Sequence, residues 1–263
     1  MEEKYRLLNE SLEAVSSGAI NLLVLNGDPG FGKSFNTLKF LEDRKIPHEY
    51  ITSYSTPLKF YDLLYRSKDK PIIIFDDLDG LQDPKIIAML KSACWNALGK
   101  SREVGYYSTS DKLDQLDLPE KFSLESGIIL IMNKPLPDFE PIINRGFKID
   151  FHFSYTDKLK IFKDVQVKAQ ISDTVLDYVT LNCNEATTNL SIRNLVILSN
   201  LERLGFNMPN FAKEMFKVDE EWGQILELLK TCETTEEACK EWCEVTGHSR
   251  RTFFRRQKIL KHK

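Results

Sequence analysis

The chain has 263 residues, 42% hydrophobic and 29% charged, which is typical of a folded protein and excludes a disordered or fibrous one. No apolar run approaches the roughly 20 residues that span a bilayer, and the charged start MEEKYRLLNESLEAV is not a secretory signal. The five cysteines are an odd number and are expected to be free thiols, so we expect a cytoplasmic protein, of a bacterial or archaeal cell or of the cytosol of an infected host, with no membrane partner.

Charge is distributed unevenly along the chain. The net charge is −3, but residues 245–263 carry seven lysines and arginines and no acidic residue. Taking these seven charges away leaves −10 on residues 1–244. An acidic body with a basic end predicts a polyanionic partner for that end.

The first 153 residues alternate short apolar runs with segments of helical spacing. The runs expected to be strands lie at 20–27, 48–53, 71–77, 127–133 and 147–153. Helices are expected between them, at 33–44, 57–67 and 84–98. Residues 102–126 fit neither pattern and are interpreted as an insertion, with a hairpin as one possibility. This alternation predicts an α/β fold with a five-stranded parallel sheet.

After residue 153 the pattern is helical throughout. Helices are expected at 156–169, 172–183, 190–205, 209–216, 220–232, 234–247 and 249–261. We therefore predict three domains: an α/β core at 1–153, a helical domain at 154–217 and a small helical module at 218–263.

The stretch GDPGFGKS follows the first expected strand and precedes a helix. It fits the pattern G-x-x-x-x-G-K-[ST], in which backbone N–H groups surround phosphates and the lysine meets the β- and γ-oxygens. The alternative is a glycine-rich turn that matches by chance. The residues expected to bind the nucleotide are Gly27, Asp28, Pro29, Gly30, Phe31, Gly32, Lys33 and Ser34.

Two carboxylates end the apolar run IIIFDD. Asp76 is expected to hold Mg²⁺ together with Ser34, and Asp77 to polarise the attacking water. The alternative is a pair of solvated carboxylates at a strand end. The cofactors predicted are therefore ATP and Mg²⁺.

The order of GDPGFGKS, IIIFDD, GIILIMN and a helical segment resembles that of AAA+ ATPases, over about residues 19–216. The resemblance implies that Asn133 is the sensor 1 residue, that Arg145 is an arginine finger serving a neighbouring subunit, and that Arg193 is the sensor 2 residue contacting the γ-phosphate. The alternatives are a strand-end cap for Asn133 and surface charges for both arginines. The Asp76–Asp77 pair departs from the commoner Asp-Glu, which puts fast hydrolysis in doubt.

The terminal module reads as a helix, a turn at Gly247 and a second helix. Thr235 is expected to start the first helix, and Ser249 to cap the second. This layout resembles a helix-turn-helix, whose second helix enters the major groove of DNA. The alternatives are a solvated basic helix or one that docks on a protein. The residues expected to contact DNA are Arg250, Arg251, Arg255, Arg256 and Lys258.

Cys232, Cys239, Cys243 and His248 raise the question of a zinc site. They lack the short Cys-x-x-Cys spacing of structural zinc, so we interpret them as small residues of the helical core.

The leading hypothesis is an AAA+ ATPase that assembles on DNA in replication or mobile-element DNA metabolism, as initiators and helicase loaders do. The expected partners are DNA, further copies of the chain in an ATP-dependent homo-oligomer, and a helicase or other DNA-processing protein. The alternatives are a nucleotide-switched DNA-binding regulator with little turnover and, less well supported by the basic tail, a small-molecule kinase.

Overall fold

The computed structural model describes residues 2–52, 55–77, 83–95, 101–107, 111–133, 139–217 and 220–262. The chain forms two compact units, Met1–Phe151 and His152–Lys263. None of the helices in these ranges is both long and apolar enough to cross a membrane. The finer division into a helical domain and a terminal module remains a prediction.

The first unit contains the predicted five-stranded parallel sheet. Its strands are β1 (Leu22–Gly27), β2 (His48–Thr52), β3 (Ile72–Asp76), β6 (Gly127–Met132) and β7 (Phe147–Phe151), in the spatial order β2-β3-β6-β1-β7. All pairings are parallel. The three central strands are buried along their whole length, which explains their continuous apolar sequences. The α/β class is confirmed.

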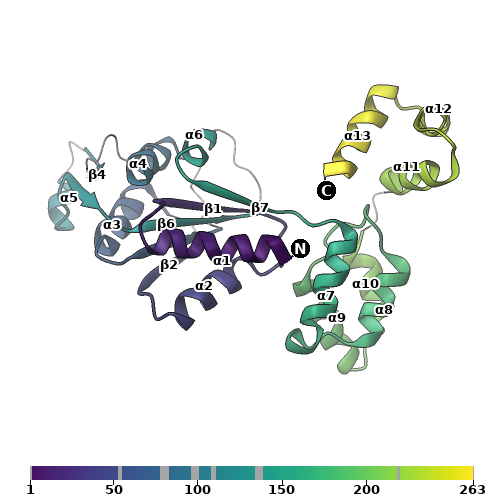
Figure 1. Ribbon diagram of the computed structural model, residues 1–263, viewed down its shortest axis with the longest axis horizontal. Helices are drawn as coiled ribbons and strands as arrows, with labels where there is room; N and C mark the ends of the chain where they lie inside the picture. The colour runs from purple at the N-terminus through teal and green to yellow at the C-terminus, as the bar shows by residue number, and fades with distance from the viewer. Residues whose placement is uncertain are drawn as a thin grey trace. The chain divides into compact units, whose positions relative to one another are not determined.

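Helices cover both faces of this sheet (Figure 1). They are α1 (Glu2–Ser16), α2 (Lys33–Asp43), α3 (Pro57–Ser67), α4 (Pro84–Cys94) and the short α6 (Glu140–Ile143). Helix α1 packs on β1, β6, β7 and α2, whereas α3 and α4 pack against each other over the opposite face. Thr56 and Asp83 cap α3 and α4 with their side chains, and a proline follows each cap.

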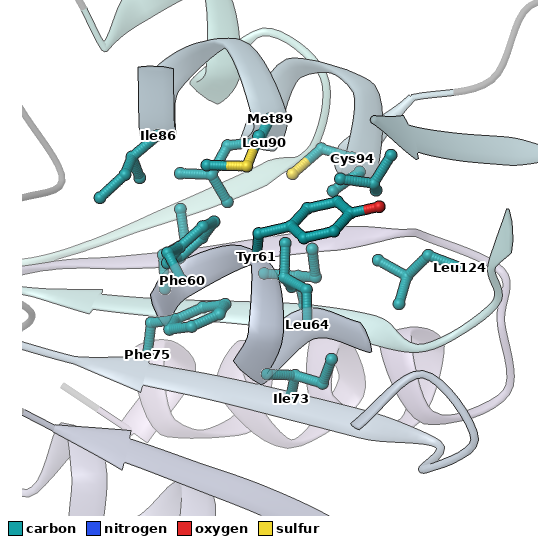
Figure 2. Close-up of a cluster of buried hydrophobic side chains, with 14 of the residues drawn as sticks. Phe60, Tyr61, Leu64, Ile73, Phe75, Ile86, Met89, Leu90, Cys94 and Leu124 are labelled. Carbon is teal, nitrogen blue, oxygen red and sulfur yellow. The ribbon is translucent and has the colours of Figure 1, made fainter. Parts of the chain in front are cut away.

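The core under α3 and α4 is densely aromatic and aliphatic. Figure 2 shows Tyr61 at its centre, with Phe60 and Phe75 on one side and Cys94 and Leu124 on the other. The rings of Phe60 and Phe75 lie 5.0 Å apart. Tyr61 is fully buried and donates its hydroxyl proton to the carbonyl of Pro119 at 2.7 Å, so the polar end of this core residue is satisfied.

The described part of the insertion at 102–126 contains an antiparallel pair of strands. Strands β4 (Arg102–Gly105) and β5 (Lys121–Leu124) pair antiparallel and flank the short helix α5 (Lys112–Gln115). Arg102 is buried and donates to the carbonyl of Ala93 at the end of α4. Burial lowers the pKa of Arg102. This pair of strands is therefore anchored on α4.

The second unit is helical. It contains α7 (Tyr155–Ala169), α8 (Asp173–Asn182), α9 (Ile192–Arg203) and α10 (Met208–Met215), followed by α11 (Glu220–Thr231), α12 (Thr235–Thr246) and α13 (Arg250–His262). Helices α7, α8 and α9 start at serine caps, which are Ser154, Ser172 and Ser191. Helices α11–α13 pack on one another around Ile225, Trp242 and Phe253.

Several predicted boundaries were wrong by a few residues. Helix α4 ends at Cys94, because Trp95 is extended, and residues 96–98 of the prediction lie outside the described ranges. Strand β7 ends at Phe151 rather than residue 153. The predicted start of α12 is confirmed: Thr235 is the first helical residue, and the hydroxyl of the cap residue Thr234 accepts from the N–H of Glu237.

Candidate nucleotide-binding site

The predicted site residues of the first unit, apart from Arg145, lie at the carboxyl ends of the strands because three strands end level. Asn26 of β1 pairs with Met132 of β6, and Asp76 of β3 pairs with Ile131 of β6. The phosphate loop, Asp77 and Asn133 therefore follow neighbouring carboxyl ends. These ends are where open parallel sheets bind ligands.

The glycines of the loop are required by its geometry. Gly30 and Gly32 have φ angles of 76° and 77°, in the left-handed region. Gly32 is the cap of α2, so the first-turn N–H groups of α2 face the loop without a capping side chain. Such a helix start is a ready anion site.

Phe31 is one of the loop residues predicted to bind the nucleotide, and its side chain is buried, at 1% exposure. Its carbonyl accepts a hydrogen bond from the Tyr5 hydroxyl at 3.1 Å, and the Tyr5 ring stands edge-on to Phe151. Burial raises the pKa of Tyr5 to about 12, so this phenol remains a donor at neutral pH. Phe31 thus fixes the loop to α1.

Lys33 links the loop to the next strand ends. Its ammonium group donates to the carbonyls of Gly27 and Asp28, at 2.8 and 2.9 Å, and to Asn133 Oδ1 at 3.1 Å. The Asn133 amide in turn donates to Asp77. Three residues predicted from separate motifs are therefore joined in one hydrogen-bonded network.

Asp77 adopts an unusual backbone conformation. Its φ is 46°, in the left-handed region, and its N–H donates to the carbonyl of Ile131. Aspartate tolerates this region better than most residues, but the conformation still costs energy, and such outliers gather at functional sites. The turn points the exposed carboxylate toward Asn133.

Tyr50 of β2 is a site residue that the sequence analysis missed. Its hydroxyl donates to Asp76 Oδ2 at 2.5 Å, and the Ser34 side chain interacts with the same phenol. Burial raises the pKa of Tyr50 to about 12, and the hydrogen bond to Asp76 adds to the shift. The predicted magnesium ligand Asp76 is thus held directly by the phenol.

Ser34 and Asp76 fit a divalent cation in their chemistry. Each offers oxygen, the ligand that Mg²⁺ prefers, and the carboxylate of Asp76 supplies negative charge at 9% exposure. A buried carboxylate is costly unless it is paired. A cation next to it would meet that need.

Arg145 lies at the opposite end of the strands, just before β7 begins. It precedes Phe147, which pairs with Leu23 at the start of β1, whereas the loop follows Gly27, which pairs with Phe151 at the end of β7. Its guanidinium donates to the carbonyl of Pro141, and it lines a pocket with the half-exposed Trp95. The length of β7, about 16 Å, separates Arg145 from the phosphate loop of its own chain.

Arg193 belongs to the second unit. It is the second residue of α9, after the cap Ser191, and its side chain is exposed. Its role toward a nucleotide stays a prediction.

The five basic residues predicted to contact DNA differ in their surroundings. Arg250 pairs with Glu236 at 2.7 Å, and Arg256 pairs with Glu221. Arg251 and Arg255 are exposed, four residues apart on α13. Lys258 lies on the same helix, and its side chain is outside the described ones.

The cysteines of the terminal helices belong to a small core. Cys239 is buried beside Trp242, and Cys232 and Cys243 pack against this cluster. Burial raises the pKa of the Cys239 thiol. Within the described residues no three metal-ligating side chains gather in one place.

No protein-family model matches the chain, and no curated protein matches it either. Solved structures do. RuvB of Thermotoga maritima, a Holliday junction branch migration motor, is 11% identical, with 96% of this chain and 83% of that one covered and a TM-score of 0.48. Cdc6p of Pyrobaculum aerophilum is 14% identical, with 99% and 85% covered and a TM-score of 0.49.

These identities and TM-scores carry nothing about function, so the assignment rests on the chain's own geometry. A phosphate loop follows β1, two aspartates end β3, an asparagine follows β6 and an arginine precedes β7, on one parallel sheet that is followed by a helical unit. This is the order of elements and polar residues that the resemblance to AAA+ P-loop ATPases implied, so the α/β fold is confirmed and membership of that family stays a prediction.

Proposed function

We propose that the protein binds and hydrolyses ATP with Mg²⁺ and assembles on DNA, in replication or mobile-element DNA metabolism. The observation that carries the ATP-binding part is the network of Lys33, Asn133 and Asp77 beside the start of α2. These groups are the ones that phosphoryl transfer needs, because its catalysis consists mainly of positioning and charge stabilisation.

Each residue has a separate task in this proposal. The N–H groups of the loop and of α2 bind the phosphates, and Lys33 neutralises their outer oxygens. Ser34 and Asp76 would hold Mg²⁺, which supplies charge neutralisation on the phosphate oxygens. Asp77 accepts a proton or hydrogen bond from the attacking water, and Asn133 orients Asp77.

Two substitutions test binding and hydrolysis separately. Lys33→Ala removes a charge-assisted contact and should lower ATP affinity about 10- to 100-fold. Asn133→Ala should keep ATP affinity within about threefold and lower turnover about 100-fold, as the loss of one oriented catalytic group does. The measurements are equilibrium binding of a fluorescent ATP analogue and steady-state phosphate release. The exposed Asn182→Ala is the matched control, and an unchanged Lys33→Ala protein would refute the proposal.

The DNA part is supported by α13, which carries exposed arginines on an otherwise acidic chain. Arg251 and Arg255 would contact phosphates, and base contacts would set any sequence preference. The test measures ATPase rate and molecular mass with and without duplex and single-stranded DNA. Turnover stimulated by DNA, together with assembly in ATP, supports the proposal. If DNA changed neither the ATPase rate nor the molecular mass, the DNA part of the proposal would be excluded.

A nucleotide-switched regulator with little turnover is the second candidate. It is favoured by the aspartate at position 77, since the shorter side chain of aspartate reaches less far than glutamate and is already bonded to Asn133. In that case ATP would change DNA affinity while phosphate release stays near background. Asp77→Glu would then leave the DNA response intact.

A further inference from the structure

We propose that Tyr50 is a positioning residue for Mg²⁺, whose phenol holds Asp76 by a hydrogen bond and orients the carboxylate that meets the metal. This inference rests on the proposed nucleotide site, and it adds a residue from a strand that carries no nucleotide motif.

The pairing of β2 with β3 brings the phenol to Asp76. Tyr50 lies on β2, which pairs in parallel with β3, and its own partner in register is Ile74, two residues before Asp76. The long side chain therefore reaches forward along the sheet to Asp76 Oδ2, at 2.5 Å. The Ser34 side chain, at the start of α2, approaches the same oxygen from the phosphate loop.

The number of protons that the phenol can donate determines how Tyr50, Asp76 and Ser34 are oriented. A neutral phenol has one proton to donate and lone pairs that accept. Tyr50 gives its proton to Asp76 Oδ2, so it can only accept from the Ser34 hydroxyl. Ser34 then keeps its oxygen lone pairs, and Asp76 keeps Oδ1, for a cation.

Residues that hydrogen-bond to metal ligands without contacting the metal have large effects on metal affinity. Hydrogen bonds to ligating side chains fix their orientation, and losing one costs about 10- to 100-fold in metal affinity. Tyr50 is 39% exposed and Asp76 9% exposed, so removing the phenol oxygen changes the site without emptying a core position.

The test is a magnesium titration of nucleotide binding with Tyr50→Phe. At a fixed concentration of a fluorescent ATP analogue, the Mg²⁺ concentration for half-maximal binding should rise about 10-fold. Binding in EDTA should be unchanged, because the loop and Lys33 act on the phosphates without the metal. Thermal melts establish that the variant is folded. Tyr107→Phe, at an exposed tyrosine, is the matched control.

A double substitution isolates the contact. In an Asp76→Asn background, Tyr50→Phe should change the Mg²⁺ concentration for half-maximal binding only a little further. The reason is that substitutions in one hydrogen-bonded network do not have additive effects. Full additivity would overturn the proposal.

Two further outcomes overturn it. An unchanged Mg²⁺ titration would leave Tyr50 a structural residue, and a lower Mg²⁺ requirement would mean that the phenol obstructs the metal. Failure of the proposed function looks different: the unmodified protein would then bind no nucleotide in Mg²⁺.

Discussion

Gly27 begins the phosphate loop at a place with no room for a side chain. A Cβ atom there would lie 2.4 Å from the carbonyl oxygen of Phe151 and 2.5 Å from its carbonyl carbon, and φ is 143°. Backbone atoms cannot give way as a flexible side chain can. The glycine is therefore required by the close approach of β7 to the loop.

We predict that Gly27→Ala pushes β7 from the loop, costs about 1–3 kcal/mol of stability and lowers ATP affinity at least about 10-fold. Gly18→Ala is the control, since Gly18 also has a positive φ, 77°, but nothing within 4 Å. It should cost about 1–2 kcal/mol and leave ATP affinity unchanged. Urea unfolding and equilibrium binding measure the two effects. Equal losses of affinity in both variants would contradict this account.

At the scale of one helix, α13 separates two classes of arginine. Phe253 and Gln257 are buried, four residues apart, and face the small core. Arg251 and Arg255, also four apart, lie on the opposite side of the helix and are exposed. Arg250 and Arg256 flank the buried face and pair with acidic residues of α12 and α11.

We therefore predict that Arg251→Ala with Arg255→Ala weakens DNA binding and reduces the slope of log affinity against log salt by about 2, as two lost phosphate contacts would. Arg250→Ala with Arg256→Ala removes the same charge but should leave the slope unchanged and lower thermal stability. Fluorescence anisotropy with a labelled duplex at several salt concentrations compares the two in the full chain. The reverse result would assign DNA contact to the paired arginines.

Helix α3 carries a buried carboxylate with two cationic neighbours. Asp62 is 5% exposed and accepts from Lys59 at 2.6 Å and from Arg66. Burial opposes the charged form, but the hydrogen bonds from Lys59 and Arg66 hold the pKa of Asp62 below its ordinary 3.8. A depressed folded-state pKa means stability that is present above about pH 4 and is lost as the pH falls further.

Asp62→Asn should thus destabilise the protein by about 1–3 kcal/mol at pH 7, and the difference should shrink as the pH falls below 3.8. Urea unfolding of the full chain at pH 7 and pH 3 provides the comparison. The exposed Asp69→Asn, just after the same helix, should change stability by less than about 0.5 kcal/mol at either pH. A destabilisation by Asp62→Asn that is as large at pH 3 as at pH 7 would rule out the charge of Asp62 as its cause.

At the scale of the whole molecule, Arg145 and Lys33 lie at opposite ends of the strands of one sheet. A single copy therefore cannot bring Arg145 to its own phosphates without breaking β7. If an arginine completes the site, as the AAA+ resemblance implies, a second copy of the chain would have to supply it. The neighbouring Trp95, 56% exposed beside Arg145, is of the residue type that anchors interfaces.

Mixing two inactive variants tests this arrangement. Arg145→Ala should bind ATP normally and lose at least about 100-fold in turnover, and Asn133→Ala lacks hydrolysis in its own site but retains Arg145. A mixture should regain activity, because the arginine of one copy completes the site of the other. An arginine acting within its own chain would give no recovery. Phosphate release over a range of mixing ratios is the measurement.

What the sequence alone determined about this protein is local in origin. The loop GDPGFGKS and the apolar strands depend on neighbours within a few residues, so spacing and residue type were sufficient to predict them. The parallel sheet also followed, because alternating strands and helices leave few other topologies. The positions of Asp76, Asp77 and Asn133 at strand ends were predicted for the same reason, since each directly ends or follows an apolar run.

Only the tertiary structure decided which distant residues meet. Tyr50 reaches Asp76 because β2 lies beside β3 in a particular register, and neither adjacency nor register is visible in HEYITS. Phe31 holds the loop in place because its carbonyl accepts a hydrogen bond from Tyr5 of α1. Arg250 and Arg256 are paired because α11 and α12 present glutamates to α13. Contacts across elements depend on packing, and the spacing along the chain does not encode them.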